Sequence, residues 1–310
     1  MRIGETLAIF FLLIGAGFGI YIMFEEINKE TVNFKPVAHE SIKVENIQKA
    51  VQFYPKMRYV NSTISYSIDS SCSVEKQSEV VNALSIISEK TVLAFVPKGE
   101  DSELKILCSE VSHPAEQNRH FIAGEGGPTI VLNTSIYYII KEGKISLFKS
   151  HSCDSPIIAL HEILHALGFD HTSDTNSIMY PVTACKQSLD QGIIDTINEI
   201  YSVKPLPDIA LTELTANKTG RYLSFKVTVS NIGLVSVKDV ELLVMTDNVE
   251  IKKFDINELN IAERKSLNVK NLKIPEDTQK VSFVINLLDN SAEISEDNNK
   301  VDLFVSSALA

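Results

Sequence analysis

The stretch HEILHALGFDHTSDTNSIMYP, residues 161–181, decides how the rest of the sequence is interpreted. Within eleven residues it contains three histidines and one glutamate, at His161, Glu162, His165 and His171. His161 and His165 are four residues apart, so on a helix their imidazoles project from the same face. Gly168 can end that helix in the left-handed conformation, which lets the chain turn back and brings His171 to the same point. We therefore expect the three imidazoles to share a metal ion.

The helix that carries this motif is expected at Pro156–Leu167. Ser155 as N-cap with proline at the first helical position is a strong start signal. Nearly all other side chains of the segment are apolar, which predicts a buried helix. Its only ionisable groups are the two histidines and Glu162, and buried ionisable groups need partners.

The arrangement predicts a catalytic zinc ion. Three neutral imidazoles leave the fourth position of tetrahedral zinc open to water, which is typical of catalytic rather than structural sites. Glu162 lies beside a ligand and could accept a proton from that water. A chance occurrence of H-E-x-x-H-x-x-G-x-x-H in a chain of this length has odds of about one in 10⁵. A lone core histidine, the alternative, does not account for the full set.

Around the motif, residues 58–203 predict a domain with strands and long helices. Strands are expected at Tyr59–Ile68, Leu93–Val96, Leu104–Leu107, Thr129–Leu132 and Ile145–Phe148. Helices are expected at Val74–Lys90, with Ser73 as N-cap, and at about Asp190–Tyr201. The glycine-rich segment Gly124–Pro128 predicts a loop, and the proline-rich segment Lys204–Asp208 predicts the domain boundary.

The first 26 residues predict a membrane anchor. From Leu7 to Phe24 no residue is charged, and 18 residues are close to the length that an α-helix needs to cross a bilayer. Arg2 precedes this run and two glutamates follow it, so the N-terminus is expected in the cytoplasm and the bulk of the chain outside. A cleaved signal peptide is the alternative. We expect a single-pass protein of the cell membrane, with its transmembrane helix in residues 1–26 and a stalk at 27–57.

Four cysteines, Cys72, Cys108, Cys153 and Cys185, follow this segment. None forms a C-x-x-C pair, and two disulfides among them allow three pairings. The pairing Cys72–Cys108 with Cys153–Cys185 is favoured because each bond closes one local loop, the second around the histidines. Free buried thiols are the alternative.

After residue 208 the sequence pattern changes to that of an all-β sandwich. Alternating segments are expected to form strands at Leu223–Val229, Val240–Met245, Lys280–Leu287 and Lys300–Val305. Residues 208–306 resemble CARDB domains, the adhesion-related Ig-like sandwiches of surface proteins, at Pro207–Ile209, Val227–Gly233 and Asp289–Asn299. Four acidic residues near the end could bind Ca²⁺, although a solvated turn is favoured: Asp289, Glu293, Glu296 and Asp297.

The motif itself resembles that of the metzincin zinc endopeptidases. The three histidines, Glu162 and Gly168 match their long zinc motif, and Ser177–Pro181 matches their Met-turn. The spacing to Met179 and the sequence Met-Tyr-Pro are most similar to the matrixin branch. The resemblance spans residues 58–202 and is most specific over 156–201. It implies an α+β catalytic domain with a mixed twisted sheet, one zinc ion and hydrolysis of peptide bonds.

The resemblance also implies a role for each site residue. His161, His165 and His171 would bind zinc, with Glu162 as the general base. Met179 would form an apolar floor beneath the metal, and Tyr180 and Pro181 would line the substrate pocket. Strand Thr129–Leu132 would be the edge to which an extended peptide adds.

This sequence departs from the family pattern in three places. No cysteine-containing inhibitory motif precedes the domain, so activation by release of a zinc-bound thiol is not supported. Gly192 and Ile193 replace an acidic pair in the closing helix. The loops that hold structural zinc and calcium in animal members are not recognisable.

Composition and motif together leave two functions. The formal net charge of −11, without a basic cluster, argues against nucleic acid as the main partner. The first function is a membrane-anchored extracellular zinc endopeptidase acting on a peptide or protein substrate, whose sandwich docks on a surface or matrix partner. The alternative is a surface adhesion protein whose zinc domain is not catalytic. Glu162 favours the enzyme, because a binding module needs no general base.

Overall fold

The computed structural model describes residues 22–26, 31–33, 51–109, 123–148, 153–288 and 291–305. The chain divides into two compact units. The α+β unit comprises Lys29–Leu206 with Gly233–Val235, and the sandwich unit comprises Pro207–Ile232 and Ser236–Ala310 with Met1–Asn28. Each unit is described by itself below.

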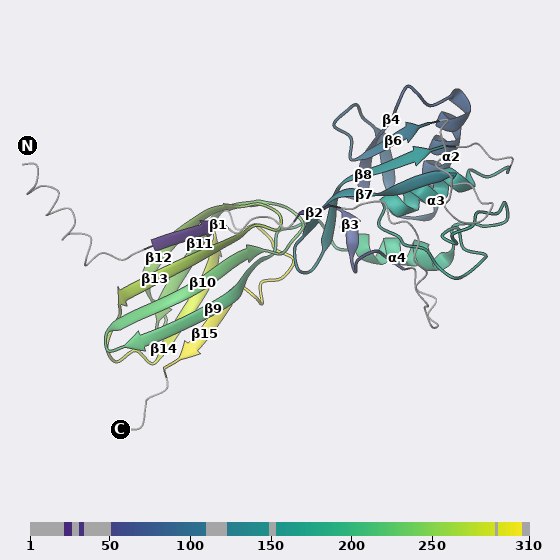
Figure 1. The fold of residues 1–310 in the computed structure, drawn as a ribbon. Coiled ribbons are helices and arrows are strands. Elements are labelled where there is room, and N and C mark those ends of the chain that lie inside the picture. The colour runs from purple at the N-terminus through teal and green to yellow at the C-terminus, as the bar shows by residue number, and fades with distance from the viewer. Residues whose placement is uncertain are drawn as a thin grey trace, which may run out of the picture. The chain divides into compact units, whose positions relative to one another are not determined.

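The α+β unit is built on a mixed seven-stranded sheet (Figure 1). Its strands are β2 (Thr31–Asn33), β3 (Met57–Tyr59), β4 (Thr63–Ile68), β5 (Ala94–Pro97), β6 (Leu104–Cys108), β7 (Gly124–Asn133) and β8 (Tyr138–Leu147). The order is β2-β7-β8-β6-β4-β5, and β3 pairs with β8. Only β7 and β2 run antiparallel to their neighbours. The mixed sheet expected from the sequence is therefore present.

Two predictions of local structure were wrong. The expected single strand Tyr59–Ile68 is divided: it contains the last residue of β3 and all of β4, which pair with different neighbours. The expected loop Gly124–Pro128 is the first half of β7 and pairs with β8 from Gly124 onwards. Its glycines let the strand approach a helix closely, a tertiary reason that local sequence does not reveal.

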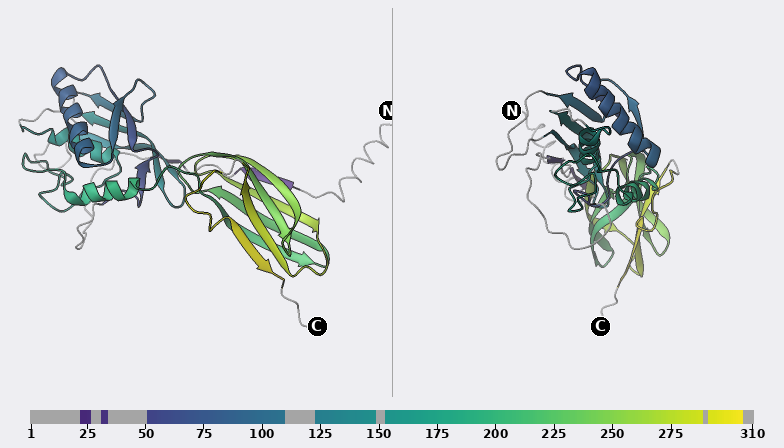
Figure 2. Two further views of the ribbon diagram at one scale, coloured as in Figure 1. Left: turned by 180° about the vertical axis from the view of Figure 1, so that it is seen from behind. Right: turned by 90° about the vertical axis from the view of Figure 1, so that its right-hand side faces the viewer.

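In the part of the chain that the structure describes, three helices accompany the sheet: α2 (Val74–Lys90), α3 (Ile157–Ala166) and α4 (Gln191–Tyr201). Helix α2 packs on α3 and β5, and α3 packs on β7 and β8 (Figures 1 and 2). The Ser73 hydroxyl caps α2 as expected, accepting a hydrogen bond from the Lys76 N–H at 3.4 Å. For α3 the cap is Pro156 rather than Ser155, and no side-chain hydrogen bond caps the helix.

Arg58 ties the beginning of the α+β unit to its end. Its guanidinium, 1% exposed, donates to the carbonyls of Tyr59 and Val60 and, at 2.6 and 3.1 Å, to those of Ile200 and Val203. Those last two carbonyls lie at the C-terminal end of α4, where helix carbonyls lack intrahelical partners. Burial lowers the pKa of Arg58. The side chain therefore anchors the closing helix.

The α+β unit begins before residue 58, in the segment expected to be a stalk. The Phe53 N–H donates to the carbonyl of Gly168 at 2.9 Å, and the Asp170 N–H donates to that of Val51 at 2.9 Å. Met57 is buried in the core, against Gly168. At least residues 51–57 are thus packed parts of this unit.

Both disulfides have the favoured pairing, Cys72–Cys108 and Cys153–Cys185. The first links the start of α2 to the end of β6. The second joins the segment before α3 to the segment before α4, so it closes the loop that contains the histidines. The alternative of free thiols was wrong.

The sandwich unit consists of two four-stranded antiparallel sheets, as expected from the alternating pattern. One has the order β1-β13-β10-β9 and the other β12-β11-β14-β15. The strands are β1 (Ile22–Glu26), β9 (Ile209–Thr219), β10 (Tyr222–Asn231), β11 (Val237–Thr246), β12 (Val249–Leu259), β13 (Arg264–Lys273), β14 (Lys280–Leu287) and β15 (Lys300–Phe304). Phe225 of the first sheet meets Phe254 and Phe283 of the second at 6.0 and 4.9 Å between ring centroids.

The expected membrane helix is not supported. Ile22–Phe24, the last three residues of the apolar run, belong to β1, whose backbone pairs with β13. The rest of the run lies outside the described residues. None of the helices in the described ranges is both long and apolar enough to span a bilayer.

Candidate metal centre

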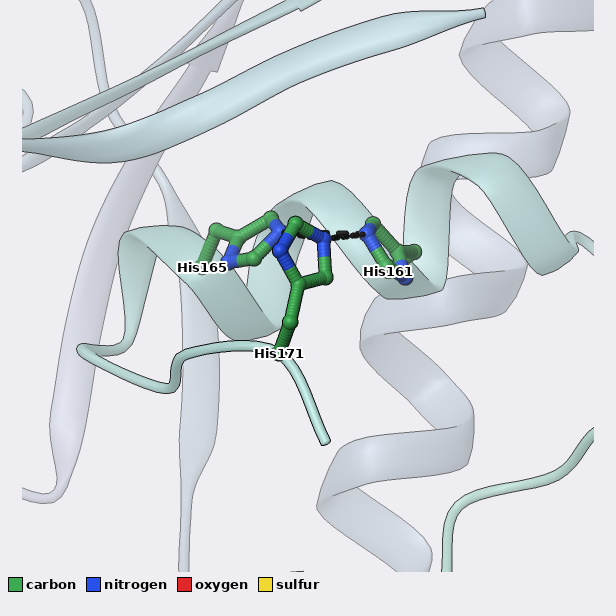
Figure 3. Close-up of side chains that lie close together, drawn as sticks. All are labelled: His161, His165 and His171. Atoms are coloured by element: carbon green, nitrogen blue, oxygen red, sulfur yellow. Dashed lines mark hydrogen bonds between the residues drawn. The ribbon is translucent and has the colours of Figure 1, made fainter. Parts of the chain in front are cut away.

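Three imidazoles converge on one point, as the motif predicts (Figure 3). His161 and His165 project from α3, and His171 comes from the loop that follows the helix (Figure 3). Their Nε2 atoms are 3.0 Å (His161–His165), 3.1 Å (His165–His171) and 3.2 Å (His161–His171) apart. Gly168 has φ = +95° and so makes the left-handed turn that returns His171 to the helix.

Backbone carbonyls fix the tautomers of the two helical histidines. Nδ1 of His161 lies 2.6 Å from the carbonyl oxygen of Ile178, and Nδ1 of His165 lies 2.7 Å from that of Phe169. A carbonyl oxygen can only accept, so each Nδ1 carries a proton. The Nε2 atom of each neutral ring then presents a lone pair, and two lone pairs 3.0 Å apart repel each other. A cation between these nitrogens turns the repulsion into coordination.

The geometry fits zinc. Zn–N distances of about 2.0–2.1 Å on a tetrahedral ion correspond to nitrogens about 3.3 Å apart, close to the separations found here. Metal-bound histidines usually donate their other N–H to a carbonyl or carboxylate, as both helical histidines do. The three imidazoles are therefore the residues that would hold the ion.

Glu162 is the one acidic side chain on α3 and is only 6% exposed. Burial raises the pKa of its carboxyl to about 8, and the nearby charge of Glu125 adds to the shift. The side chain lies against the glycines at the start of β7. A buried carboxyl beside a metal ligand, with a pKa near neutrality, is typical of a general base.

The segment that contains Met179 contacts both His161 and the closing helix. Ile178 supplies the carbonyl that orients His161, and Met179 is 2% exposed. The Ser177 hydroxyl accepts from the Met179 N–H at 3.1 Å and donates to Asp190, the N-cap of α4, at 2.6 Å. This Met-turn therefore keeps His161 in the tautomer with a proton on Nδ1. It also joins the site to α4.

The two expected pocket residues follow this turn. Tyr180 is half-buried and Pro181 is exposed. The Tyr180 N–H donates to the carbonyl of Ser177 at 3.2 Å, which closes the turn. Their role in substrate binding stays a prediction, as does the role of Met179 as a floor beneath the metal.

The expected substrate edge is already partly paired. Ile130–Leu132 of β7 form an antiparallel ladder with Thr31–Asn33 of β2. A segment N-terminal to the domain thus adds to this edge as an extended strand. An external peptide could pair with the same residues only after displacing β2.

Sequence reasoning missed two groups that position the ligands. The Phe53 ring stacks on His165, with ring centroids 5.8 Å apart and planes at 22°. The Asp170 carboxylate accepts from the His171 N–H at 2.7 Å. Asp170 lies inside the motif and could have been noticed. Phe53 is more than 100 residues away in sequence, and its only signal was the aromatic pair Phe53-Tyr54 in a polar segment.

Among the described residues, the histidine cluster is the one group of three or more His, Cys, Asp or Glu side chains that could hold a metal. The acidic turn of the sandwich unit does not form a second. Glu293 instead accepts from the Ile209 N–H at 2.7 Å, while Glu296 and Asp297 are exposed. Asp289 lies outside the described residues. The solvated turn and the Ca²⁺ site both stay predictions.

Two comparisons with known proteins found similarities. The matrixin family model matches residues 58–202. The C-terminal region is similar to a CARDB domain from Pyrococcus furiosus, whose crystal structure is a complex with di-metal ions. That match has 19% identity and a TM-score of 0.28, and it covers 32% of this chain and 87% of the other. The solution NMR structure of the same domain matches with 19% identity and a TM-score of 0.28, covering 32% and 94%.

No curated protein matches the chain. The family match covers the sheet strands β4 to β8, the helices α2 to α4 and the three histidines of the candidate metal centre. Residues 58–202 therefore match the matrixin family, and this match supports a zinc metallopeptidase at family level.

Proposed function

We propose that the chain is a zinc endopeptidase in which Glu162 acts as the general base. The observation that carries this proposal is the convergence of three imidazole Nε2 atoms beside a buried glutamate. Zinc held there would lower the pKa of a water molecule and polarise the substrate carbonyl. Glu162 would accept the proton of the attacking water and pass it to the leaving amine. The carbonyls of Ile178 and Phe169 would keep His161 and His165 in the coordinating tautomer.

The alternative is a surface binding protein whose zinc domain is not catalytic. Burying a carboxyl group without need lowers stability, since desolvation disfavours its charged form. A module that only holds peptide or matrix would gain nothing from Glu162 at this place. The CARDB-like unit is then proposed to dock or space the protease on a surface or matrix partner.

We also propose that the folded units lie outside the cytoplasm. Two disulfides support this location, because such bonds persist in oxidising compartments. The membrane anchor rests on the apolar run Leu7–Phe24 alone. Protease accessibility of the sandwich unit on intact cells tests the location, and cleavage only after lysis would contradict it.

The catalytic proposal is tested with the full chain and the variant Glu162→Gln. Zinc content should stay at one ion per chain in both. Cleavage of a quenched peptide library should fall by about 10²–10⁴-fold in the variant, the usual contribution of a general base. Glu89→Gln, on the exposed face of α2, is the matched control and should cleave like the parent. Zinc without cleavage in the parent would favour the binding module.

A further inference from the structure

Strand β7 runs directly beside the helix that carries the metal motif (Figure 1). It begins with Gly124-Glu125-Gly126-Gly127, and alternate residues of a strand face opposite sides. Gly124 and Gly126 therefore share one face, and that face meets Glu162. Gly127 belongs to the other face, and a Cβ there would have no atom within 4 Å.

Backbone conformation does not explain the two glycines that face Glu162. Within the described ranges, the glycines with left-handed φ are Gly168 and Gly220, and β7 contains neither. Any residue could adopt the extended backbone of Gly124 and Gly126. What distinguishes these positions is which atoms of Glu162 an added Cβ would meet.

At Gly124 that space is filled by the glutamate side chain. An added Cβ would lie 2.7 Å from Cγ of Glu162 and 3.0 Å from both Cδ and Oε1. Real Cβ atoms essentially never come within 3.0 Å of a neighbour, so one group would have to move. The group that moves most easily is the glutamate side chain, because it turns about single bonds. The strand could keep its place, but the carboxylate could not.

At Gly126 the neighbour is the helix backbone. An added Cβ would overlap the carbonyl oxygen of Glu162 and lie 2.9 Å from its carbonyl carbon. A backbone carbonyl inside a helix cannot turn away, so β7 and α3 would have to separate. The two glycines thus constrain different parts of the same residue.

We propose that Gly124 is a positioning residue for the Glu162 carboxylate and that Gly126 sets the distance between β7 and α3. This inference rests on the proposed function of Glu162 as general base. The missing Cβ of Gly124 leaves room for the carboxylate against the strand. The missing Cβ of Gly126 lets the helix, with two of the three zinc ligands, lie close to the sheet.

The first test measures catalysis and metal content in three alanine variants of the full chain. Gly124→Ala should lower kcat by about 10²-fold, the loss typical of a misplacement near 1 Å, with KM and zinc content close to those of the parent. Gly126→Ala should lower both zinc retention and thermal stability. Gly127→Ala is the matched control and should change none of these. Parental kcat in Gly124→Ala, or an equal loss in Gly127→Ala, would overturn the proposal.

The second test needs no catalysis. Gly124→Ala should lower the thermal midpoint of the parent by about 2–4 °C, but not that of Glu162→Ala, which lacks the three crowded atoms. Gly126→Ala should lower the midpoint equally in both backgrounds, because its neighbour is backbone. An equal shift from Gly124→Ala in both backgrounds, or none in either, would overturn the positioning role. A parent that binds zinc and cleaves nothing would contradict the proposed function. The comparison of thermal midpoints in the two backgrounds would still show whether Gly124 is packed against the Glu162 side chain.

Discussion

The polar contacts inside the sandwich unit differ in kind from those at the metal centre. In the sandwich unit, hydroxyls pair with one another: the buried Thr228 with Ser266 at 2.7 Å, and the exposed Thr212 with the buried Ser230 at 2.7 Å. A hydroxyl both donates and accepts, so each pair is satisfied without help. At the metal centre the Nδ1–H groups of His161 and His165 are used on carbonyls, and only lone pairs meet in the middle. These hydroxyl pairs therefore need no further partner, whereas the three converging imidazoles would be stabilised by a cation between them.

Removal of zinc should produce the largest difference in thermal stability between the two units. A chelator should lower the thermal midpoint of the α+β unit on the order of 10 °C, because binding to the native state alone stabilises it by several kcal/mol. The sandwich unit should keep its midpoint. Calorimetry measures both transitions, and hydrogen-exchange mass spectrometry assigns them. Equal shifts in both units would contradict the assignment of the metal site.

Arg58→Met should produce the next largest effect, about 3 kcal/mol of lost stability in the α+β unit. The change leaves the partly buried carbonyls of Ile200 and Val203 without their donor. Denaturant unfolding measures the loss. Arg221→Met is the control, since Arg221 is exposed and 3.8 Å from Glu276, and it should change stability by less than about 0.5 kcal/mol. Similar losses in the two variants would mean that the Arg58 contacts contribute little.

Phe53→Leu should weaken zinc binding about tenfold, the lower end of the effect expected when a group that orients a ligand is changed. The substitution keeps an apolar side chain but removes the ring stacked on His165. Competition with a chromophoric chelator measures the affinity. Phe254→Leu, the same change in the sandwich unit, should leave zinc affinity unaltered. Parental affinity in Phe53→Leu would show that the carbonyl of Phe169 suffices to hold His165.

A smaller effect is expected from pH on the sandwich unit. Burial raises the pKa of Asp208 and of Glu293 above the usual carboxyl values. The folded state then holds their protons more tightly, so these groups lower stability as pH rises from the unfolded pKa of about 4 through the raised folded pKa. Asp208→Asn should flatten that part of the stability curve, as followed by chemical denaturation at several pH values.

Asp302 of the same unit is the control, because its pKa is shifted in the opposite direction. A hydrogen bond from Ser282 and the charge of Lys300 lower its pKa. Its contribution is present above the unfolded pKa and is lost as pH falls through the folded pKa. Asp302→Asn should therefore reduce stability at neutral pH but not at low pH. Identical pH profiles for the two variants would refute the assigned shifts.

The metal ligands could be predicted because their signal is local. His161 and His165 share one face of one helix, and the turn at Gly168 is encoded by the residue that performs it. The disulfide pairing could be predicted for a similar reason, since each bond closes a single local loop. In the sandwich unit, alternation predicted β10, β11, β14 and β15 within a few residues, but it gave neither the partners nor β9, β12 and β13. Pairing between strands that lie far apart in sequence depends on both strands, so no single segment predicts it.

The features that position Glu162 and His165 could not be predicted, because they depend on contacts far apart in sequence. Gly124 and Gly126 resemble loop glycines until β7 is placed against α3. Phe53 resembles a stalk residue until its N–H is found on the carbonyl of Gly168. The motif therefore predicts which residues act, and the structure adds the contacts that hold them in place.

Zinc K-edge absorption on the purified full chain, with metal analysis, tests the central claim most directly. The account predicts one zinc per chain, with three imidazole nitrogens at about 2.0–2.1 Å and no sulfur ligand. His171→Ala should lose one of these nitrogens or the ion itself. A chain that binds no zinc, or zinc with an unchanged ligand set in His171→Ala, would contradict the account.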